Sequence, residues 1–441
     1  MMSPMHVIAA VSLLALVSAC ATTPPPDPRA LQNAAVNQIA ERYIASVLAL
    51  GEHDAHYVDA YYGPESRREA VRATKPALTE IVADARLQVL RLDGLLHDRA
   101  PAMERLRHGY LRRQLLALIV RAEQLQGREQ AFDAEAQALY DIAPPQHSES
   151  ELLVRLDELE ALLPPGAGTL AERYNAYVER YAIPRDQLEP VMRAAIEEAR
   201  RRTQAQIPLP PGERFELALV EGKSWSAYNW YQGGFHSRIE INTDLPVTVS
   251  RAIELAVHEG YPGHHVYNAL LEQKLVRERG WPEFSVYPLF TPQSLIAEGT
   301  ADYAVALAFP LEERVRFVRD TLFPLAGFDP AEAERYVAIS EAGRGTGAAT
   351  IEAARRYLDG TADVEATVAR LQRYALATEA RARQRVKFFD DYRAYIVNYS
   401  LGERLVTDYM ARVAGDDVAQ RWNEFAALLA SPRLPSDLRP D

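Results

Sequence analysis

The chain of 441 residues contains a single cysteine, Cys20, so it cannot form an intramolecular disulfide. The fold must therefore be stabilised by its core alone. Positive charge is also scarce: 61 acidic residues outnumber 49 lysines and arginines, which gives a formal net charge of −12. Because a phosphate backbone repels an acidic surface, we do not expect nucleic acid as a partner. The shares of hydrophobic (48%) and charged (25%) residues are those of an ordinary globular protein.

The apolar run near the N-terminus, "VIAAVSLLALVSAC", is too short to span a bilayer as a mature helix. It ends in the form of a signal peptide with a lipobox, and its last residue is Cys20. We expect a lipoprotein signal peptide over residues 1–20 with cleavage before Cys20, lipid on Cys20, and a Pro-rich tether over residues 21–30. This predicts a bacterial cell-envelope protein, a periplasmic lipoprotein anchored in the outer membrane only through its N-terminal lipid. The alternative is an ordinary secretory signal, since the first six residues contain no lysine or arginine.

Residues 31–207 are predicted to form one helix after another. Apolar residues recur at intervals of three and four in residues 77–96, 103–125 and 148–164, which is the spacing of a buried helix face. The last of these segments begins with the Ser-x-x-Glu pattern of a capping box. Segments that contain proline separate the helices.

The pattern changes after residue 208. Aromatic and β-branched residues are frequent in residues 214–222 and 228–246, and the second segment ends in alternation, which predicts a small β-hairpin or meander. Helical spacing then returns over residues 249–429. The expected fold class is therefore mainly α, a large multi-helix fold with a small β-hairpin or meander beside one helix.

Residues 258–265 read "HEGYPGHH", which is close to the HExxH motif of zinc hydrolases but lacks its second histidine. A zinc hydrolase needs three protein ligands, an open position for water, and a carboxylate that accepts the proton of that water. His258 is a candidate ligand. Glu259 points at least a quarter-turn away from His258 on a helix, so it can reach the water as a general base instead of binding the metal.

The second ligand is either His264 or His265. On a straight helix His264 would lie roughly 240° round from His258, and His265 would lie about 10.5 Å further along the axis. Pro262 should prevent a straight helix because it removes a backbone donor and its ring clashes with a preceding carbonyl. Gly263 allows the backbone of a distorted turn. Geometry alone leaves the two histidines equal.

The third ligand should come from the helix predicted at residues 294–307, "SLIAEGTADYAVAL". Glu298 and Asp302 lie one turn apart on the same face of this apolar helix. Because carboxylates are costly to bury unpaired, a metal ion and a histidine N–H would account for both. We expect Glu298 to bind the metal and Asp302 to orient a ligand imidazole from the second shell of the site. The alternative is that Asp302 faces solvent or caps a turn.

These segments, with "GGFHSRIEINTDLP" at residues 233–246, resemble the bacterial domain-of-unknown-function 885 (DUF885) family over roughly residues 210–410. That family is grouped with gluzincin-type zinc metallopeptidases and is similar in architecture to the mostly helical carboxypeptidase Taq family. The resemblance implies a metallopeptidase-like fold with one Zn²⁺ ion, and it favours His264 over His265 because the position after PGH is not always histidine in the family. The matching residues are His258, Glu259, Pro262, Gly263, His264, Glu298, Gly299, Ala301 and Tyr303.

The chain departs from the family pattern in two places. Thr300 stands where the family commonly has tryptophan, which would alter the wall of the pocket. The C-terminal family segment is replaced by "RAYIVNYSLGE" at residues 393–403, in which only Tyr399 and Gly402 align. A tyrosine or arginine here could stabilise the oxyanion of the transition state, and we expect Tyr399 in this role, ahead of Tyr395 and Arg393.

Substrate is expected to bind along the strand "SRIEINTDLP", as an extended peptide paired with an edge strand beside the metal helix. The candidate substrate-binding residues are His236, which could instead cap the hairpin, Arg238, Glu240 and Asn242.

A second group of polar residues lies in "GEHDAHYVDAYYGPE", residues 51–65, where His53, His56 and Asp59 are spaced three apart. This spacing could indicate a second metal site. The favoured interpretation is an aromatic-rich helix end that forms one wall of a cleft.

The sequence therefore predicts a zinc-dependent hydrolase, a metallopeptidase that cleaves peptide bonds with metal-activated water and with Glu259 as general base. Residues 208–435 would carry the zinc site, although residues 31–435 could pack as one domain around a central cleft. The substrate would be a peptide or a small amide. One alternative is a zinc amidase or esterase that acts on non-peptide or cell-wall substrates. Another is a non-catalytic, peptide-binding envelope lipoprotein, but such a protein has no need of Glu259 beside His258.

Overall fold

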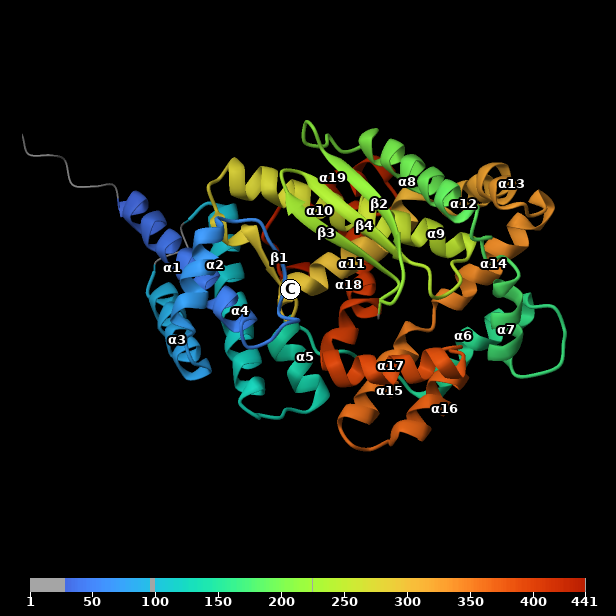
Figure 1. Ribbon diagram of the computed structural model, residues 1–441, viewed down its shortest axis with the longest axis horizontal. Coiled ribbons are helices and arrows are strands. Elements are labelled where there is room, and N and C mark those ends of the chain that lie inside the picture. Colours follow the sequence, from blue (N-terminus) through green and yellow to red (C-terminus); the bar gives the residue numbers. More distant parts are fainter. Residues whose placement is uncertain (1–27, 96–99, 224, 441) are drawn as a thin grey trace, which may run out of the picture.

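The computed structural model describes residues 28–95, 100–223 and 225–440. The protein is mainly helical with two small sheets, which confirms the predicted fold class (Figure 1). Cys20 and the expected signal peptide lie outside the described residues. Within the described ranges, none of the helices combines the length and the apolar character needed to cross a bilayer.

The N-terminal half forms helices where apolar residues are spaced for them. The capping box expected before residue 151 is present: the Glu151 N–H donates to Ser148 Oγ at 3.3 Å, and the Ser148 N–H donates to Glu151 Oε2 at 2.7 Å. The helices of this half are α1 (Pro28–Gly51), α2 (Glu65–Thr74), α3 (Leu78–Asp93), α4 (Ala102–Leu125), α5 (Phe132–Tyr140), α6 (Glu149–Leu162), α7 (Leu170–Glu179) and α8 (Leu188–Gln204).

The C-terminal half is also helical and packs with the N-terminal helices around one continuous hydrophobic core. Short π-helical or 3₁₀ segments interrupt it, and two of these matter for the site: η1 (Ala256–Gly260) and η6 (Arg393–Asn398). The helices are α9 (Val249–Leu255), α10 (His264–Leu271), α11 (Pro292–Ala308), α12 (Leu311–Phe317), α13 (Phe323–Ala326), α14 (Ala333–Arg344), α15 (Gly347–Leu358), α16 (Val364–Tyr374), α17 (Glu379–Tyr392), α18 (Ser400–Ala414) and α19 (Val418–Leu429).

A three-stranded sheet covers the helices near the middle of the chain (Figure 1). Its strands are β2 (Arg214–Val220), β3 (Ala227–Gly233) and β4 (His236–Asn242), in the order β2-β4-β3. β3 and β4 form the predicted antiparallel hairpin, but β2 pairs parallel to β4, so the meander alternative is wrong. The connection from β2 to β3 crosses the end of β4, where the Asn242 side-chain amide donates to two of its carbonyl groups.

The central position of β4 overturns the expectation that this strand is a free edge. Both sides of β4 are paired, and the edges of the sheet are β2 and β3. Ser237, Ile239 and Ile241 of β4 are fully buried, but Glu240 and Asn242 between and after them are buried too, so exposure alternates only over the first half of the strand. The edge strand that packs against η1 and α10 is β3. Local pattern could not show this, because hydrogen-bonded neighbours in a sheet are not set by order in the chain alone.

A second, two-stranded sheet joins β1 (Val58–Tyr61) to β5 (Val286–Pro288) in antiparallel register. The interpretation of residues 51–65 as a helix end is therefore wrong after Gly51, the last residue of α1. The aromatic and β-branched residues that follow are typical of a strand, and their partner lies far along the chain. β1 lies beside β3, as Figure 1 shows.

Candidate metal centre

The segment "HEGYPGHH" interrupts a helix instead of continuing it. α9 runs into η1, the chain leaves the helix at Tyr261 and Pro262, which are joined by a cis peptide bond, and α10 begins at His264. A Cβ atom on Gly263 would lie 2.0 Å from the carbonyl oxygen of His258, so only glycine fits where the backbone folds back on itself. The predicted distortion at Pro262 and Gly263 is thus a complete break between two helical segments.

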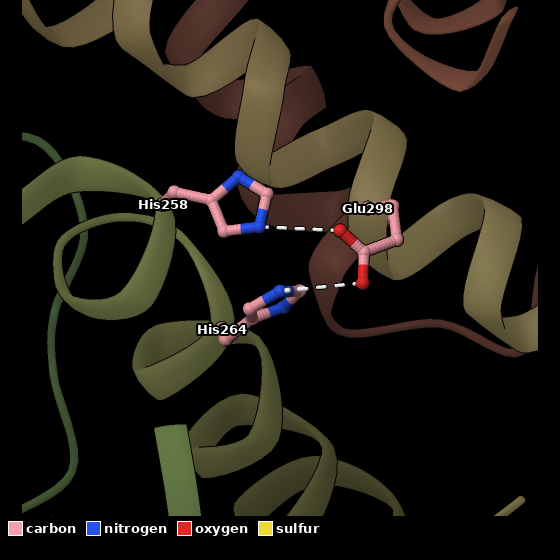
Figure 2. A group of neighbouring side chains, drawn as sticks. All are labelled: His258, His264 and Glu298. Carbon is pink, nitrogen blue, oxygen red and sulfur yellow. Dashed lines mark ion pairs between the residues drawn. The ribbon is translucent and has the colours of Figure 1, made fainter. Parts of the chain in front are cut away.

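This break brings His258 and His264 together on Glu298 of α11, as Figure 2 shows. His258 Nε2 lies 3.2 Å from Glu298 Oε2, and His264 Nε2 lies 3.7 Å from Glu298 Oε1. The candidate ligand atoms of the three residues all lie within 4.8 Å of one another. Their side chains keep 14%, 12% and 9% of their surface exposed, so solvent can reach the cluster.

His265 lies elsewhere. Its Nδ1 is 2.8 Å from Ser237 Oγ, and its Nε2 is 3.0 Å from Glu213 Oε2. The side chain is only 1% exposed, and Glu213 also accepts a hydrogen bond from Tyr261 at 2.6 Å. Among the alternatives that sequence geometry left equal, the structure therefore groups His264 with the candidate ligands, while His265 fastens α10 to the sheet.

Asp302 lies behind His258, as expected, with its Oδ1 2.8 Å from His258 Nδ1. A proton on Nδ1 shared with this carboxylate leaves Nε2 free to face Glu298. Burial alone would lower the pKa of His258, but Asp302 and Glu298 raise it well above its usual range. Burial lowers the pKa of His264 to about 4, so this imidazole is neutral at physiological pH.

The three residues fit a divalent metal ion. Glu298 Oε2 is buried and accepts no hydrogen bond, although His258 Nε2 is within 3.2 Å. Burial alone would raise the pKa of Glu298, but His264 and His258 lower it, so the carboxylate is ionised. Two imidazoles and one carboxylate are the ligand set of many catalytic zinc sites. Within residues 28–95, 100–223 and 225–440, this is the one group of histidines and acids with such geometry.

Glu259 is adjacent to His258 on η1 and is buried, with 6% of its surface exposed. Burial raises the pKa of Glu259 to about 7; the negative charge of Glu298 adds to this rise, and His258 opposes it. A carboxyl group with a pKa near neutrality can both take up and release a proton at physiological pH.

The segment that carries Tyr395 and Tyr399 lies near the cluster, next to the point where α11 and α18 cross in backbone contact. A Cβ on Gly299 would lie 2.5 Å from the carbonyl carbon of Gly402, so both positions exclude larger residues. Tyr395, on η6 before this crossing, donates from its hydroxyl to Glu298 Oε1 at 2.9 Å. The Tyr399 ring lies 6.0 Å from that of Tyr395 and is half-buried. The negative charge of Glu298 contributes, after burial, to a pKa of Tyr399 well above its usual range.

Two other expectations for this region are not supported by the geometry. Arg393 turns away from the cluster: its Nε donates to Glu135 Oε2 of α5 at 2.8 Å. Thr300 is 1% exposed and its hydroxyl donates to the Ile296 carbonyl at 2.7 Å, so it lies inside the helix packing and not on a pocket wall.

The four substrate-binding candidates on β4 are all engaged in the sheet. His236 lies against Glu216 of β2 at 3.4 Å, and Asn242 holds the loop between β2 and β3. Arg238 donates to Glu240 at 2.9 Å, and Glu240 also accepts a hydrogen bond from Trp230 Nε1 at 3.0 Å. Because β4 is a central strand, its polar side chains have partners within the sheet and its loop, and their role in substrate binding stays a prediction.

The three spaced residues of the segment 51–65 also separate. His53 Nε2 lies 2.8 Å from the carbonyl oxygen of Pro76, and the His56 ring packs at 5.4 Å against Tyr392. They form no metal-binding group with Asp59. Asp59 itself lies within the electrostatic influence of Glu298 and Glu259. Sequence reasoning missed this because the pairing of β1 with β5 that places Asp59 is not a local pattern.

Comparisons with solved structures find chains that align with this one at low sequence identity. A candidate lipoprotein from Colwellia psychrerythraea has a similar structure, with a TM-score of 0.51 and 16% identity over 83% of this chain, and this chain spans 66% of its length. A candidate lipoprotein of unknown function from Shewanella oneidensis gives a TM-score of 0.49 with 12% identity, over 86% and 78% of the two chains. An M32 carboxypeptidase from Deinococcus radiodurans gives 0.46 with 12% identity, over 93% and 94%. No family model and no curated protein matches the chain.

Proposed function

We propose that this protein is a zinc-dependent metallopeptidase of the bacterial cell envelope. The observation that carries the proposal is the convergence of His258, His264 and Glu298, with Asp302 on the outer nitrogen of His258 and Glu259 beside it. A binding protein has no need of a buried carboxyl group next to a metal ligand. Resemblance of the motifs to the DUF885 family supports the same assignment.

The proposed ligands are His258, His264 and Glu298. Zinc held there supplies a Lewis acid that polarises a carbonyl group and makes water a better nucleophile. Asp302 fixes the His258 ring through its Nδ1, and Tyr395 fixes the Glu298 carboxylate through Oε1. Both ligand side chains are thus held in orientation by a neighbour before any metal binds.

Glu259 acts as the general base in this proposal. It takes a proton from the attacking water and delivers it to the nitrogen of the leaving amine. Its pKa of about 7 suits both transfers. Tyr399 is the proposed donor to the oxyanion, since its hydroxyl is protonated at neutral pH and its ring lies beside Tyr395.

The envelope location rests on Cys20 and the lipobox before it. The fold shared with the Colwellia protein, described as a candidate lipoprotein, agrees with this location. A lipid on Cys20 would hold the protein at the outer membrane by its N-terminus.

The test is the substitution Glu259→Gln in purified, zinc-loaded protein, with Glu278→Gln as the control. Glu278 is an exposed acid that pairs with Lys274 at 2.7 Å. We expect Glu259→Gln to keep its zinc and to lose about 100-fold or more of its rate on a peptide mixture, while Glu278→Gln keeps both. Retained turnover in Glu259→Gln would contradict the assigned role. If wild-type protein cleaves muropeptides but no peptide in the mixture, the substrate is an amide of the cell wall instead.

A further inference from the structure

Asp59 occupies a β-bulge at the edge of the candidate metal centre. Its neighbours Val58 and Ala60 pair with the consecutive residues Pro288 and Tyr287 of β5, so Asp59 is the extra residue of β1. A bulge redirects a side chain out of the regular alternation of a strand, and bulges are common next to active sites.

The side chain of Asp59 is held in place by β3, the edge strand of the larger sheet. The Tyr228 hydroxyl donates to Asp59 Oδ1. The next residue, Asn229, donates from its side-chain amide to the main-chain oxygen of Glu259 at 2.5 Å. Adjacent residues of one strand therefore connect Asp59 to the segment that carries the proposed general base.

Asp59 has no cation as a partner. In the part of the chain that the structure describes, no arginine, lysine or histidine forms an ion pair with it, and Tyr228 provides its one hydrogen bond. Burial, together with the negative charges of Glu298 and Glu259, raises the pKa of Asp59 to about 8. An acid in this position is short of positive charge, and a cationic ligand would stabilise its ionised form.

A second polar group beside Asp59 is also without a partner. Tyr287, which faces Ala60 across the small sheet, is 7% exposed, and its hydroxyl has no hydrogen-bond partner among the described residues. Its phenol lies within the influence of both Glu298 and Asp59.

Aromatic rings surround the Tyr228 end of the site. The Tyr228 ring lies 4.4 Å from that of Trp230 and 5.6 Å from that of Trp225, and Trp230 is 41% exposed. Ring faces attract cations, ammonium groups included. The Asp59 carboxylate and the aromatic rings beside it, of which Trp230 is exposed, are suited to a protonated amine.

We propose that Asp59 determines specificity by binding a protonated amine of the substrate beside the bond that is cleaved at the metal centre. This inference rests on the proposed peptidase function. The ammonium group is either the free N-terminus of the peptide or a lysine side chain. Tyr228 is a positioning residue that keeps the Asp59 carboxylate directed at the amine.

The experiment compares three randomised peptide libraries cleaved by the zinc-loaded protein. The first has free N-termini and no lysine or arginine, the second is N-acetylated and also lacks both residues, and the third is N-acetylated but contains lysine. We expect the wild type to cleave either the first or the third library about tenfold faster than the second, which carries no amine. A hydrogen bond to a charged group contributes enough free energy to change a rate by roughly tenfold or more. Faster cleavage of the first library identifies the N-terminus, and faster cleavage of the third identifies lysine.

Asp59→Asn should remove this preference. The variant should cleave the favoured library as slowly as the second library, and its rate on the second library should equal that of the wild type. Tyr228→Phe should weaken the preference, and Glu65→Gln, an exposed acid at the start of α2, should leave it unchanged. Equal rates on the three libraries with wild type would overturn the inference but not the peptidase function. No cleavage of any library would overturn both.

A binding measurement provides a readout independent of turnover. Calorimetry on the Glu259→Gln variant would measure the affinity for the peptide that the wild type cleaves fastest. The comparison is with a peptide of the same sequence that lacks the amine, either because its N-terminus is acetylated or because norleucine replaces its lysine. We expect about tenfold weaker binding of the uncharged peptide, and no difference once Asp59→Asn is added. A difference that persists in the double variant would place the amine elsewhere.

Discussion

His264 and His265 are consecutive residues whose side chains belong to different parts of the protein. His264 Nε2 lies 3.7 Å from Glu298 Oε1 in the candidate metal centre, whereas His265 is buried between Ser237 and Glu213 at 2.8 Å and 3.0 Å. Both sit in the first turn of α10, where successive residues are about 100° apart. The break at Gly263 sets the start of α10, so it decides which histidine faces the candidate metal centre.

The hydrogen bond between His265 and Glu213 predicts that the stability of the folded protein depends on pH. Burial alone would raise the pKa of Glu213, but hydrogen bonds from His265, Tyr261 and Arg200 lower it to about 2. A carboxyl group whose pKa is lower in the folded than in the unfolded chain stabilises the folded state at pH values above its unfolded pKa of 4.5. This contribution is lost as the pH falls toward 2. Urea unfolding of metal-free protein should show Glu213→Gln less stable at pH 7, by an amount that shrinks below pH 4.5. A difference that does not change with pH would contradict the prediction.

Asp302→Asn should weaken zinc binding without unfolding the protein. The variant loses a carboxylate that accepts from His258 Nδ1 at 2.8 Å, so the ring is held less firmly and is a weaker base. Loss of such a partner typically lowers metal affinity about 10- to 100-fold. Competition with a chelator measures the affinity, and Asp320→Asn, at an exposed ion pair, is the control. Equal affinities in the two variants would show that Asp302 does not orient the ligand.

The two tyrosines of the C-terminal region should give different results when changed to phenylalanine. Tyr399→Phe should lower kcat by roughly 100-fold or more with zinc binding intact, as for loss of an oxyanion donor. Tyr395→Phe removes the hydrogen bond to Glu298 Oε1, so it should weaken zinc binding first. Turnover and zinc affinity measured on both variants distinguish the roles. If Tyr395→Phe alone reduced kcat at saturating zinc, Tyr395 would be the donor.

The backbone contact between Gly299 and Gly402 should tolerate no side chain. A Cβ on Gly402 would lie 2.9 Å from the Gly299 Cα, and crowding of this kind costs about 1–3 kcal/mol. Gly402→Ala should therefore lower the melting temperature. Gly345→Ala is the matched control, because its Cβ would meet nothing closer than 3.7 Å. A melting temperature of Gly402→Ala equal to that of the control would contradict the prediction.

Local patterns predicted His258 and Glu298 as candidate ligands, but they left His264 and His265 equal, and the family resemblance favoured His264. The break at Pro262 and Gly263 is a local consequence of two residue types, and Glu298 and Asp302 share a face of one helix. Asp59 could not be found in this way, since only the pairing of β1 with β5 places it. The hydrogen-bond partners of Arg393 and Asn242 could not be predicted either, because no local pattern links them in the sequence. Glu135, the partner of Arg393, lies on α5, and the carbonyl groups bound by Asn242 lie in the loop before β3.

The most direct test of the metal centre is the zinc content of wild type, His264→Ala and His265→Ala after dialysis against trace zinc. Circular dichroism identifies conditions in which all three are folded, because loss of the His265 hydrogen bonds should cost about 1–3 kcal/mol of stability. The structure predicts about one zinc per chain in the wild type and in His265→Ala, and almost none in His264→Ala. Zinc retained by folded His264→Ala and lost from folded His265→Ala would contradict the account.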